Sequence, residues 1–360
     1  MECSFGKIIG GKCLCVGKNT YLCNMKILKF TPIYKKKVWG SETWVVSAVP
    51  ESTSVLENGE ADGELANGVS LPELVRRYGA DFLGRKNWEH FGAEFPLLVK
   101  FIDAHDDLSI QVHPNDELAQ ERHGCMGKTE MWFVMDAGPG ARLYSGFKER
   151  ISPYEYEKRV EDGSITDVLQ CHSVNRGDVF FIPAGRIHAI CGGIRLAEIQ
   201  QTSDVTYRIF DYNRPGLDGK MRELHTELAK DAIDYTVYPT YQTDYLSKIN
   251  NPVAITHCPY FTVKIHNITR PYHRKLYKYD SFVIYICLNG DCMIREHRRR
   301  LFPKSNLDTV TLTKGESCVV PMACADIDLV PNNDRGLTEL LEVYVDNRNP
   351  KSELTTTRNS

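Results

Sequence analysis

The sequence has no long apolar run and no excess of one charge. No stretch of about 18 consecutive apolar residues, the length that a helix needs to cross a bilayer, occurs in the 360 residues. Lys and Arg number 44 against 47 Asp and Glu, which gives a formal net charge of −3. This balance gives no reason to expect nucleic acid or an anionic membrane as partner, and we expect an ordinary globular protein.

Paired metal-binding cysteines are also missing, although the chain has twelve cysteines. Cys13 and Cys15 are too close together for the usual zinc pair, and no second pair follows. The eight cysteines beyond residue 24 are scattered, mostly in apolar runs such as VIYICLNGDCMI. We therefore expect buried free thiols in a reducing compartment.

The first residues do not form a secretory signal. Lys12 and neighbouring glycines interrupt the only apolar run, and no small-residue cleavage pattern follows it. Met25 then opens the alternating segment MKILKFTPIYKKKVWG. We expect residues 1–24 to be a start-site extension without structure or function, and the protein to be cytoplasmic.

Many short strands are predicted along the rest of the chain. The segments FPLLVKFIDA, LSIQVHP, EMWFVM, DVFFIPAG and GIRLAEIQQ read as strands, and a second β-rich block runs from residue 260 to residue 345. Glycine and proline turns between short strands favour a sandwich or barrel over a parallel α/β sheet. A chain of 41.0 kDa has room for two domains. We place them at 25–250 and 251–348, followed by a disordered tail at 349–360.

Three helices are predicted within the first domain. SLPELVRRYG has Ser70 as its N-cap and Gly79 as its stop, and SPYEYEKRVEDG begins and ends in the same manner at 152–163. The segment MRELHTELAKDAI at 221–233 is amphipathic. The side chains expected on its apolar face are Leu224, Leu228, Ala232 and Ile233.

The two β-rich blocks share a spaced pattern, GDVFFIP in the first and GESCVVP in the second. Five residues beyond the proline stands His188 in the first block and Asp326 in the second. Similarly, Glu130 stands eight residues before a glycine, where the second block has Phe282. The fold needs the glycine and proline, whereas chemistry needs the histidine and carboxylate. We therefore interpret the blocks as two related barrels, one active and one structural without metal ligands.

Polar side chains at alternate positions of one strand point to a metal site. Ser109, Gln111 and His113 share one face of LSIQVHP, Glu130 begins the next apolar run, and His188 follows the turn PAG. Each alone fits an exposed strand end or turn, but a small barrel can bring them together in its interior. Two imidazoles, a carboxylate and an amide oxygen suit Zn²⁺ or another borderline divalent ion.

Four segments together resemble one enzyme family. PLLVKFIDAHDDLSIQVHPND, GKTEMWFVM, GDVFFIPAGRIHAI and EIQQTSDVTYRIFDYNR are similar to the type I mannose-6-phosphate isomerases of the cupin superfamily, in their short bacterial form. The resemblance extends over about residues 30–345. It implies a mainly β fold of two cupin-type (jelly-roll) β-barrels, with a few helices inserted in and around the N-terminal barrel. Asn115 departs from the HPDD form of the motif, where an aspartate stands.

The resemblance also assigns residues. It implies one divalent metal ion, with zinc first and manganese, cobalt or iron as substitutes. The implied metal ligands are Gln111, His113, Glu130 and His188. The implied catalytic residues are Glu198, Arg208 and Lys128, and the implied substrate contacts are Lys100 and Ser109.

The implied reaction interconverts mannose 6-phosphate and fructose 6-phosphate by moving a proton between C1 and C2 through a cis-enediol. Such a reaction needs a base with a pKa near neutral, and Glu198, between apolar neighbours, is our candidate. Arg208 would stabilise the enediolate or hold the phosphate. No glycine-rich phosphate loop of known spacing occurs, so side chains such as Lys100, Lys128 and Ser109 must bind the phosphate.

Two alternatives stay open at this point. A catalytically weak, sugar-phosphate-binding regulatory cupin could retain the fold, and an iron-dependent oxygenase could use the same two histidines and carboxylate. The retained base and the lysines favour the isomerase. The oligomeric state, monomer or homodimer, is not determined by the sequence.

Overall fold

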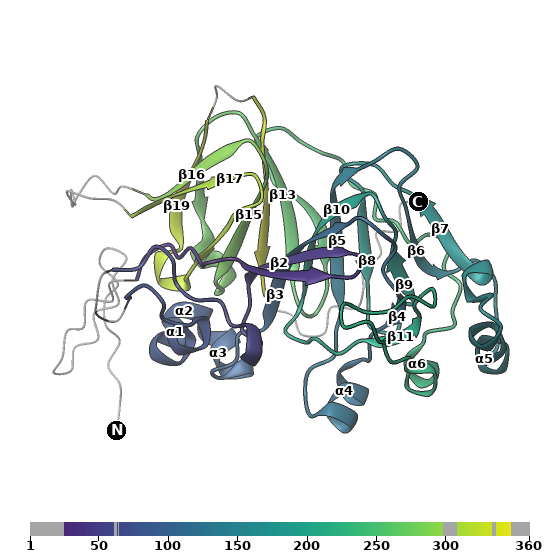
Figure 1. Cartoon of the computed structure of the whole chain (residues 1–360). Helices are drawn as coiled ribbons and strands as arrows, with labels where there is room; N and C mark the ends of the chain where they lie inside the picture. The colour runs from purple at the N-terminus through teal and green to yellow at the C-terminus, as the bar shows by residue number, and fades with distance from the viewer. Residues whose placement is uncertain (1–24, 61–62, 64, 298–307, 333–335, 347–360) are drawn as a thin grey trace.

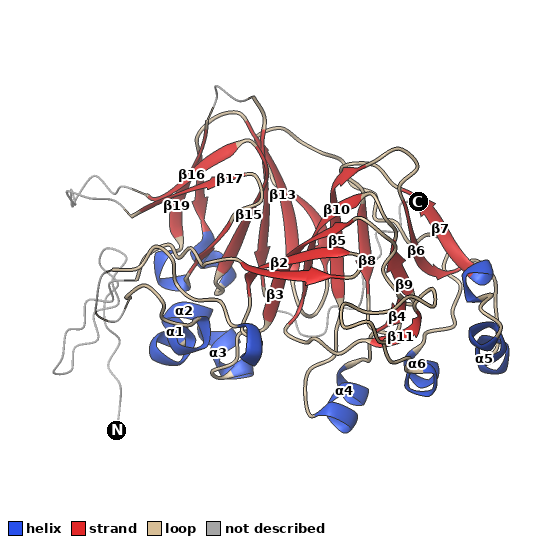
Figure 2. Cartoon of the chain, in the orientation of Figure 1, coloured by secondary structure: helices blue, strands red, loops and turns tan. Residues whose placement is uncertain are grey.

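The computed structural model describes residues 25–60, 63, 65–297, 308–332 and 336–346. The predicted extension at 1–24, the predicted tail at 349–360 and part of the basic run after Arg295 lie outside these ranges. Within them, antiparallel strands dominate and helices are few (Figure 2), which confirms the prediction of a mainly β fold. None of the described helices is long and apolar enough to cross a membrane.

The first unit consists of two antiparallel sheets. The larger sheet has the order β1-β2-β3-β10-β5-β8, and the smaller has the order β11-β4-β9-β6-β7. The strands of the larger sheet are β1 (Ile33–Lys37), β2 (Gly40–Val46), β3 (Leu97–Ala104), β5 (Glu130–Ala137), β8 (Val179–Ile182) and β10 (Ile194–Gln201). Those of the smaller sheet are β4 (Ile110–Val112), β6 (Arg142–Phe147), β7 (Leu169–Ser173), β9 (His188–Ile190) and β11 (Tyr207–Phe210).

The second unit repeats this arrangement. Its larger sheet has the order β12-β13-β20-β15-β18, with β12 (Val253–His257), β13 (Thr262–Ile268), β15 (Val283–Asn289), β18 (Ser317–Val320) and β20 (Thr338–Tyr344). Its smaller sheet has the order β14-β19-β16-β17, with β14 (Tyr272–Lys275), β16 (Asp291–Glu296), β17 (Thr309–Thr313) and β19 (Asp326–Pro331). The order β3-β10-β5-β8 with β4-β9-β6-β7 recurs as β13-β20-β15-β18 with β14-β19-β16-β17. Two such four-stranded sheets form a jelly roll.

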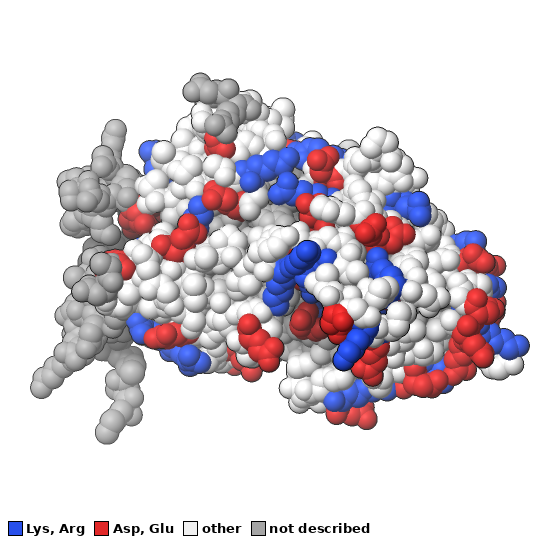
Figure 3. Space-filling view, in the orientation of Figure 1, with Lys and Arg blue, Asp and Glu red and all other residues white. Residues whose placement is uncertain are grey.

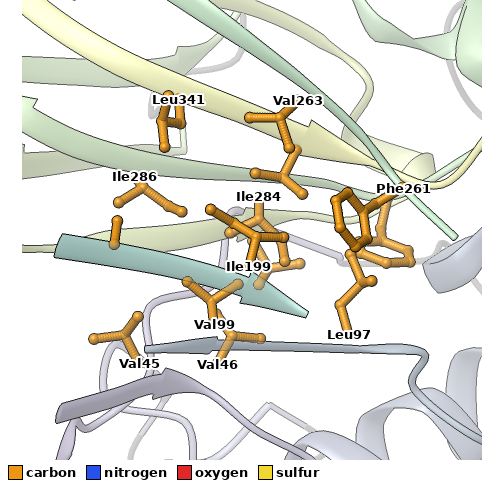
Figure 4. Packing of buried hydrophobic residues seen from close by; sticks show 14 of the residues in the cluster. Val45, Val46, Leu97, Val99, Ile199, Phe261, Val263, Ile284, Ile286 and Leu341 are labelled. Carbon is orange, nitrogen blue, oxygen red and sulfur yellow. The ribbon is translucent and has the colours of Figure 1, made fainter. Parts of the chain in front are cut away.

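The larger sheets of the two units share one hydrophobic core. Figure 4 shows Val99 and Ile199 of the first unit packed with Val263, Ile284 and Leu341 of the second. Each of these side chains is buried, and burying one aliphatic side chain of this size contributes roughly 1.5–3 kcal/mol. The units therefore stabilise each other, and they stand side by side in Figure 1.

The helices lie outside the sheets, most of them along the lower side of the molecule in Figure 1. They are α1 (Leu71–Tyr78), α2 (Ala80–Leu83), α3 (Arg85–Phe91), α4 (Asp116–His123), α5 (Pro153–Glu161) and α6 (Thr226–Ala232). Short 3-10 turns are η1 (Pro50–Ser52), η2 (Ile165–Val168), η3 (Leu276–Tyr279) and η4 (Met322–Cys324). The predicted caps are present, because the hydroxyl of Ser70 accepts from the backbone N–H of Glu73 and that of Ser152 from Glu155. Helices α5 and α6 contribute Tyr156 and Ala229 to a core on the outer face of the smaller sheet.

Two parts of the helix prediction are wrong. Helices α2, α3 and α4 were not predicted, although Asn115 caps α4 by accepting from the N–H of Leu118. Helix α6 is shorter than 221–233, and the expected apolar face is only partly buried, because Ala232 and Ile233 pack against a core while Leu224 and Leu228 are 44% and 36% exposed. The reason is that the N–H of His225 donates to the carbonyl of Arg208, which holds the preceding residues along β11 instead of in a helix.

The surface and thiols agree with the composition. Lys and Arg are interspersed with Asp and Glu on the face shown in Figure 3. None of the eight cysteines in the described ranges forms a disulfide, and five of them are buried. Cys171 in β7 is exposed, contrary to the expectation of burial.

Candidate active site

Three of the predicted ligands meet inside the first unit. His113 follows β4, Glu130 is the first residue of β5, and His188 is the first residue of β9. Nε2 of His113 is 3.4 Å from Oε2 of Glu130, and Nε2 of His188 is 3.5 Å from Oε1. The imidazole centroids are 4.8 Å apart. Side chains far apart in the sequence thus present two nitrogens and a carboxylate to one point.

The two imidazoles use their Nδ1 atoms for hydrogen bonds, and their Nε2 atoms, which face Glu130, make none among the described residues. Nδ1 of His113 lies 3.0 Å from the carbonyl of Val205, and Nδ1 of His188 lies 2.7 Å from that of Arg186. A carbonyl only accepts, so each Nδ1 carries the proton and each Nε2 presents a lone pair. Among the described residues, these Nε2 atoms and both Glu130 oxygens are buried and make no hydrogen bond. Unpaired buried groups are costly, and a divalent cation would satisfy all four atoms.

Local electrostatics favour the protonation states that a metal requires. Burial and the nearby Lys128 lower the pKa of His113 to about 3, and burial lowers the pKa of His188. Burial alone would raise the pKa of Glu130, but Lys128 and the two imidazoles lower it well below its usual range. Neutral imidazoles beside an ionised carboxylate are the forms that bind a cation.

Gln111, the fourth predicted ligand, lies beside this group. It pairs across the sheet with His188 on one side and Arg208 on the other. Its side chain lines the neighbouring cavity and is half-buried. The structure therefore brings Gln111 next to the three ligands, at the boundary between them and the cavity.

A polar cavity of about 240 Å³ adjoins the three ligands. Its charged lining comprises Lys37, Glu42, Lys100, Lys128, Glu198, Asp204, Arg208 and Arg222, and further lining includes Ser109, Gln111 and Thr206. Every predicted catalytic and substrate residue thus faces it. His113, Glu130 and His188 do not line it themselves, but Gln111 pairs with His188 and Nζ of Lys128 is 3.3 Å from Oε2 of Glu130. Five cations against three carboxylates suit an anionic ligand.

Glu198 of β10 is the buried carboxylate of this cavity. Nζ of Lys100 lies 2.9 Å from its Oε1, and Nε1 of Trp132 donates to its Oε2 at 2.9 Å. Trp132 also packs edge-on against the ring of His188, with centroids 5.3 Å apart. Burial and the charge of Glu130 raise the pKa of Glu198, against the opposing effect of Lys100. Glu198 therefore lies between the ligand group and the cavity with the raised pKa expected of a base.

Arg208 and Ser109 border the same space. Arg208 donates from Nη1 to the carbonyl of Glu223 at 2.9 Å, and burial and then Arg222 lower its pKa. Its Nε is buried without a hydrogen-bond partner among the described residues. Ser109 is buried immediately before β4. Both have polar atoms that a bound ligand can contact.

Several lining residues were missed from the sequence. Lys37 and Glu42 come from the β1–β2 hairpin, where their side chains are 3.5 Å apart, and Glu42 accepts from Nε1 of Trp44 at 2.7 Å. Burial would raise the pKa of Glu42, but Lys100 and Lys37 lower it to about 2. The alternation in IYKKKVWG indicated a strand, but nothing local indicated which face lines a cavity. Asp204 lies inside the recognised segment EIQQTSDVTYRIFDYNR and could have been found there.

In the described part of the second unit, other side chains stand at the positions of these ligands, but the predicted counterparts are shifted by one residue. In the first unit, the residue before the proline of the block is Ile182, and it pairs with Glu130. In the second unit, the corresponding residue is Val320, and it pairs with Val283, which is therefore the counterpart of Glu130. Phe282 instead faces the shared core of the two units. A shift of one residue along a strand turns a side chain to the opposite face.

The remaining counterparts follow from the same pairing. Gln111 pairs with His188 in the first unit, and Arg274 pairs with Ile327 in the second. The count along the chain differs between the units because η4 adds one residue after the proline of the second block. Ile327 therefore corresponds to His188, and the predicted Asp326 points outward. Arg274 forms a two-point ion pair with buried Glu342, at 2.6 and 2.9 Å.

Comparisons with known proteins agree with this geometry. The family model described as phosphomannose isomerase type I, catalytic domain, matches residues 2–130. Mannose-6-phosphate isomerase ManA of Bacillus subtilis is 34% identical over 269 residues, which cover 67% of this chain and 79% of that protein. Mannose-6-phosphate isomerase of Streptococcus mutans is 37% identical over 215 residues, covering 55% of this chain and 65% of that protein.

Solved structures show the same fold. The crystal structure of the mannose 6-phosphate isomerase from Bacillus subtilis superposes with a TM-score of 0.75 at 27% identity, covering 89% of this chain and 99% of that chain. A putative mannosephosphate isomerase from Archaeoglobus fulgidus has the same fold, with a TM-score of 0.70 at 20% identity and coverage of 89% and 98%. With the sequence similarity to ManA over most of that protein, these likenesses show that the chain belongs to the type I phosphomannose isomerase family.

Proposed function

We propose that this protein is a metal-dependent aldose–ketose isomerase that interconverts mannose 6-phosphate and fructose 6-phosphate. The observation that carries the proposal is the group of buried Nε2 and carboxylate atoms of His113, Glu130 and His188, which make no hydrogen bond among the described residues and lie beside a cationic cavity that holds a buried glutamate. A sugar phosphate is anionic, and the cavity has an excess of cations. Family membership supports the same reaction.

The metal is proposed to be a single zinc ion. Its ligands would be His113, Glu130 and His188, with Gln111 as the fourth donor, because a mixed nitrogen and oxygen set suits zinc. When bound, the ion supplies a Lewis acid for the oxygens on C1 and C2 of the sugar.

Glu198 is the proposed base. Its carboxylate takes the proton from C2 of open-chain mannose 6-phosphate while O1 gains a proton, which gives the cis-enediol. The same group then returns the proton to C1 while O2 loses its hydroxyl proton, which gives fructose 6-phosphate and restores the carboxylate, so that one hydroxyl proton moves from O2 to O1 overall. Trp132 and Lys100 fix the orientation of the carboxylate through its two oxygens. Lys100 remains a candidate substrate contact because it lines the cavity, but its ion pair makes it chiefly the partner of the base.

The remaining polar groups are proposed to bind the substrate. Arg208, whose Nε lacks a partner among the described residues, would stabilise the enediolate or contact the phosphate through its planar guanidinium. Lys128 contributes positive charge near Glu130, and Ser109 offers a hydroxyl at the cavity wall. The cavity has no glycine-rich loop for a phosphate, so these side chains must supply the contacts.

Two further expectations are kept as proposals. The division into a catalytic domain at 25–250 and a second domain at 251–348 is supported by the repeated strand order. A cytoplasmic location is supported by the free thiols in the described ranges.

The test is the substitution Glu198→Gln, which keeps the shape of the side chain but removes its basicity. The variant should bind mannose 6-phosphate while its turnover falls by about 10²–10⁴. Glu117→Gln, at an exposed position of α4, is the matched control and should retain full activity. A wild-type protein that binds the sugar phosphate without turnover would indicate the regulatory alternative, and oxygen uptake in place of isomerisation would indicate the oxygenase.

A further inference from the structure

A second group of metal-ligating side chains lies in the smaller sheet of the second unit. His273 belongs to β14, His297 follows the last residue of β16, and Asp326 and Asp328 belong to β19. Strand β19 lies between β14 and β16 in the sheet. In Figure 1, β16 and β19 are at the end of the molecule away from β4 and β9, so this group is separate from the active-site cavity.

The strand pattern places these side chains on the outer face. Ile327 and Leu329 of β19 point into the core of the second unit, so Asp326 and Asp328, at the alternate positions, point outward. His273 is directly opposite Asp328 across the sheet, and the backbone N–H of His297 donates to the carbonyl of Asp326 at 2.9 Å. One histidine therefore stands on each side of the aspartate pair.

The contacts run diagonally and bring the two imidazoles together. Nε2 of His273 is 2.6 Å from Oδ1 of Asp326, and Nδ1 of His297 is 2.8 Å from Oδ1 of Asp328. The imidazole rings stack with centroids 3.7 Å apart and planes 19° from parallel. One donor atom each from His273, His297 and Asp328 lies within 4.8 Å of the others.

Each histidine has two ring nitrogens and uses one of them for its contact with an aspartate. With zinc–nitrogen distances of about 2.0–2.1 Å, small side-chain rotations would bring the three donors around one ion.

We propose that His273, His297 and Asp328, with Asp326 beside them, form a second binding site for a divalent transition-metal ion of the zinc class. Nε of Arg295 lies 3.5 Å from Oδ2 of Asp328 and holds that carboxylate with Oδ1 toward the histidines. Two imidazoles and a carboxylate are a donor set that zinc, cobalt and copper accept. The site is independent of the proposed isomerase activity.

Exposure distinguishes the two sites. The side chains of His273 and His297 are 32% and 33% exposed, whereas those of His113 and His188 are 1% and 0% exposed. An ion at the outer site is in contact with solvent and exchanges readily, while an ion at the inner site does not. Purified protein should therefore carry a tightly held ion and a second, readily removed one.

The test is equilibrium dialysis of the untagged full chain against Zn²⁺ alone, with the bound metal measured per chain. The double substitution His273→Gln with His297→Gln should remove one exchangeable equivalent and leave isomerase activity unchanged. The matched control is His105→Gln, because His105 is a surface histidine with an aspartate carboxylate 3.6 Å away. Asp328→Asn, which keeps the shape and the hydrogen bonding, should weaken binding of the exchangeable equivalent about tenfold or more.

The outcomes separate the two sites. A variant with both His113 and His188 replaced by alanine should lose activity and the tightly held ion but keep the exchangeable one. The second site is overturned if the His273/His297 variant binds as much zinc as the His105 control, or if the His113/His188 variant binds none. An unchanged zinc affinity in Asp328→Asn would also overturn it. Failure of the isomerase assay alone would affect only the proposed function.

Discussion

The ion pair between Lys100 and Glu198 offers a quantitative test of the proposed base. The charged atoms are 2.9 Å apart and buried. At an effective dielectric constant of about 20, unit charges at that distance attract by about 6 kcal/mol. In Lys100→Met this attraction is lost, while the cost of burying the ammonium is also removed. If a net of about 3 kcal/mol is lost from the ionised form of Glu198, its acid dissociation constant falls about 100-fold, which raises its pKa further.

The expected result is therefore a fall in kcat of up to about 100-fold at pH 7, with recovery as the pH is raised, because the acid limb of the kcat profile moves to higher pH. The assay is steady-state isomerisation of mannose 6-phosphate across the pH range. Lys36→Met, at an exposed position of β1, is the control and should behave as wild type. A variant with unchanged kcat and pH profile but a raised KM would refute the reasoning, since Lys100 would then be a phosphate contact only.

Three further predictions concern both units. Glu342→Gln should destabilise the protein by about 3–5 kcal/mol in urea denaturation, because it leaves the Arg274 guanidinium without its buried carboxylate; a change below about 1 kcal/mol would contradict this. Burial would raise the pKa of Glu342, but His266 and Arg274 lower it, so its contribution to stability is complete above the ordinary value of 4.5 and is lost as the pH falls below that value. The stability difference between wild type and Glu342→Gln should accordingly narrow in acid, and a difference independent of pH would count against the ion pair. Trp132→Phe should lower kcat more than it raises KM, because it removes the hydrogen bond to Glu198 while keeping the aromatic ring beside His188; an effect on KM alone would show that the indole does not orient the base.

The sequence pattern and the recognised segments were sufficient to select three side chains that the structure brings together. Alternation placed Gln111 and His113 on one face of a strand, and the recognised segments added Glu130 and His188. These inferences need only the local periodicity of a strand and sequence segments that resemble a known family. The structure brings three of these side chains together and sets Gln111 beside them.

The rest depended on which strands become neighbours. The hydrogen bond from Trp132 to Glu198 joins β5 to β10, and Lys37 and Glu42 reach the cavity only because β2 pairs with β3. The order of the strands in a sheet depends on packing over the whole unit, and a local sequence pattern does not contain this information. The predicted counterparts Phe282 and Asp326 were also wrong, because they were found by counting residues along the chain. A shift of one residue moves a strand side chain to the opposite face of the sheet.

The central claim is that His113, Glu130 and His188 hold a divalent cation on which isomerisation depends. The direct measurement is a titration of metal-stripped protein with Zn²⁺, with mannose 6-phosphate isomerisation followed at each addition. We predict no activity without metal and a rise that is complete at about one equivalent per chain, since the buried group binds first. Full activity in the stripped protein, or the same rise when His113 and His188 are both alanine, would contradict the claim.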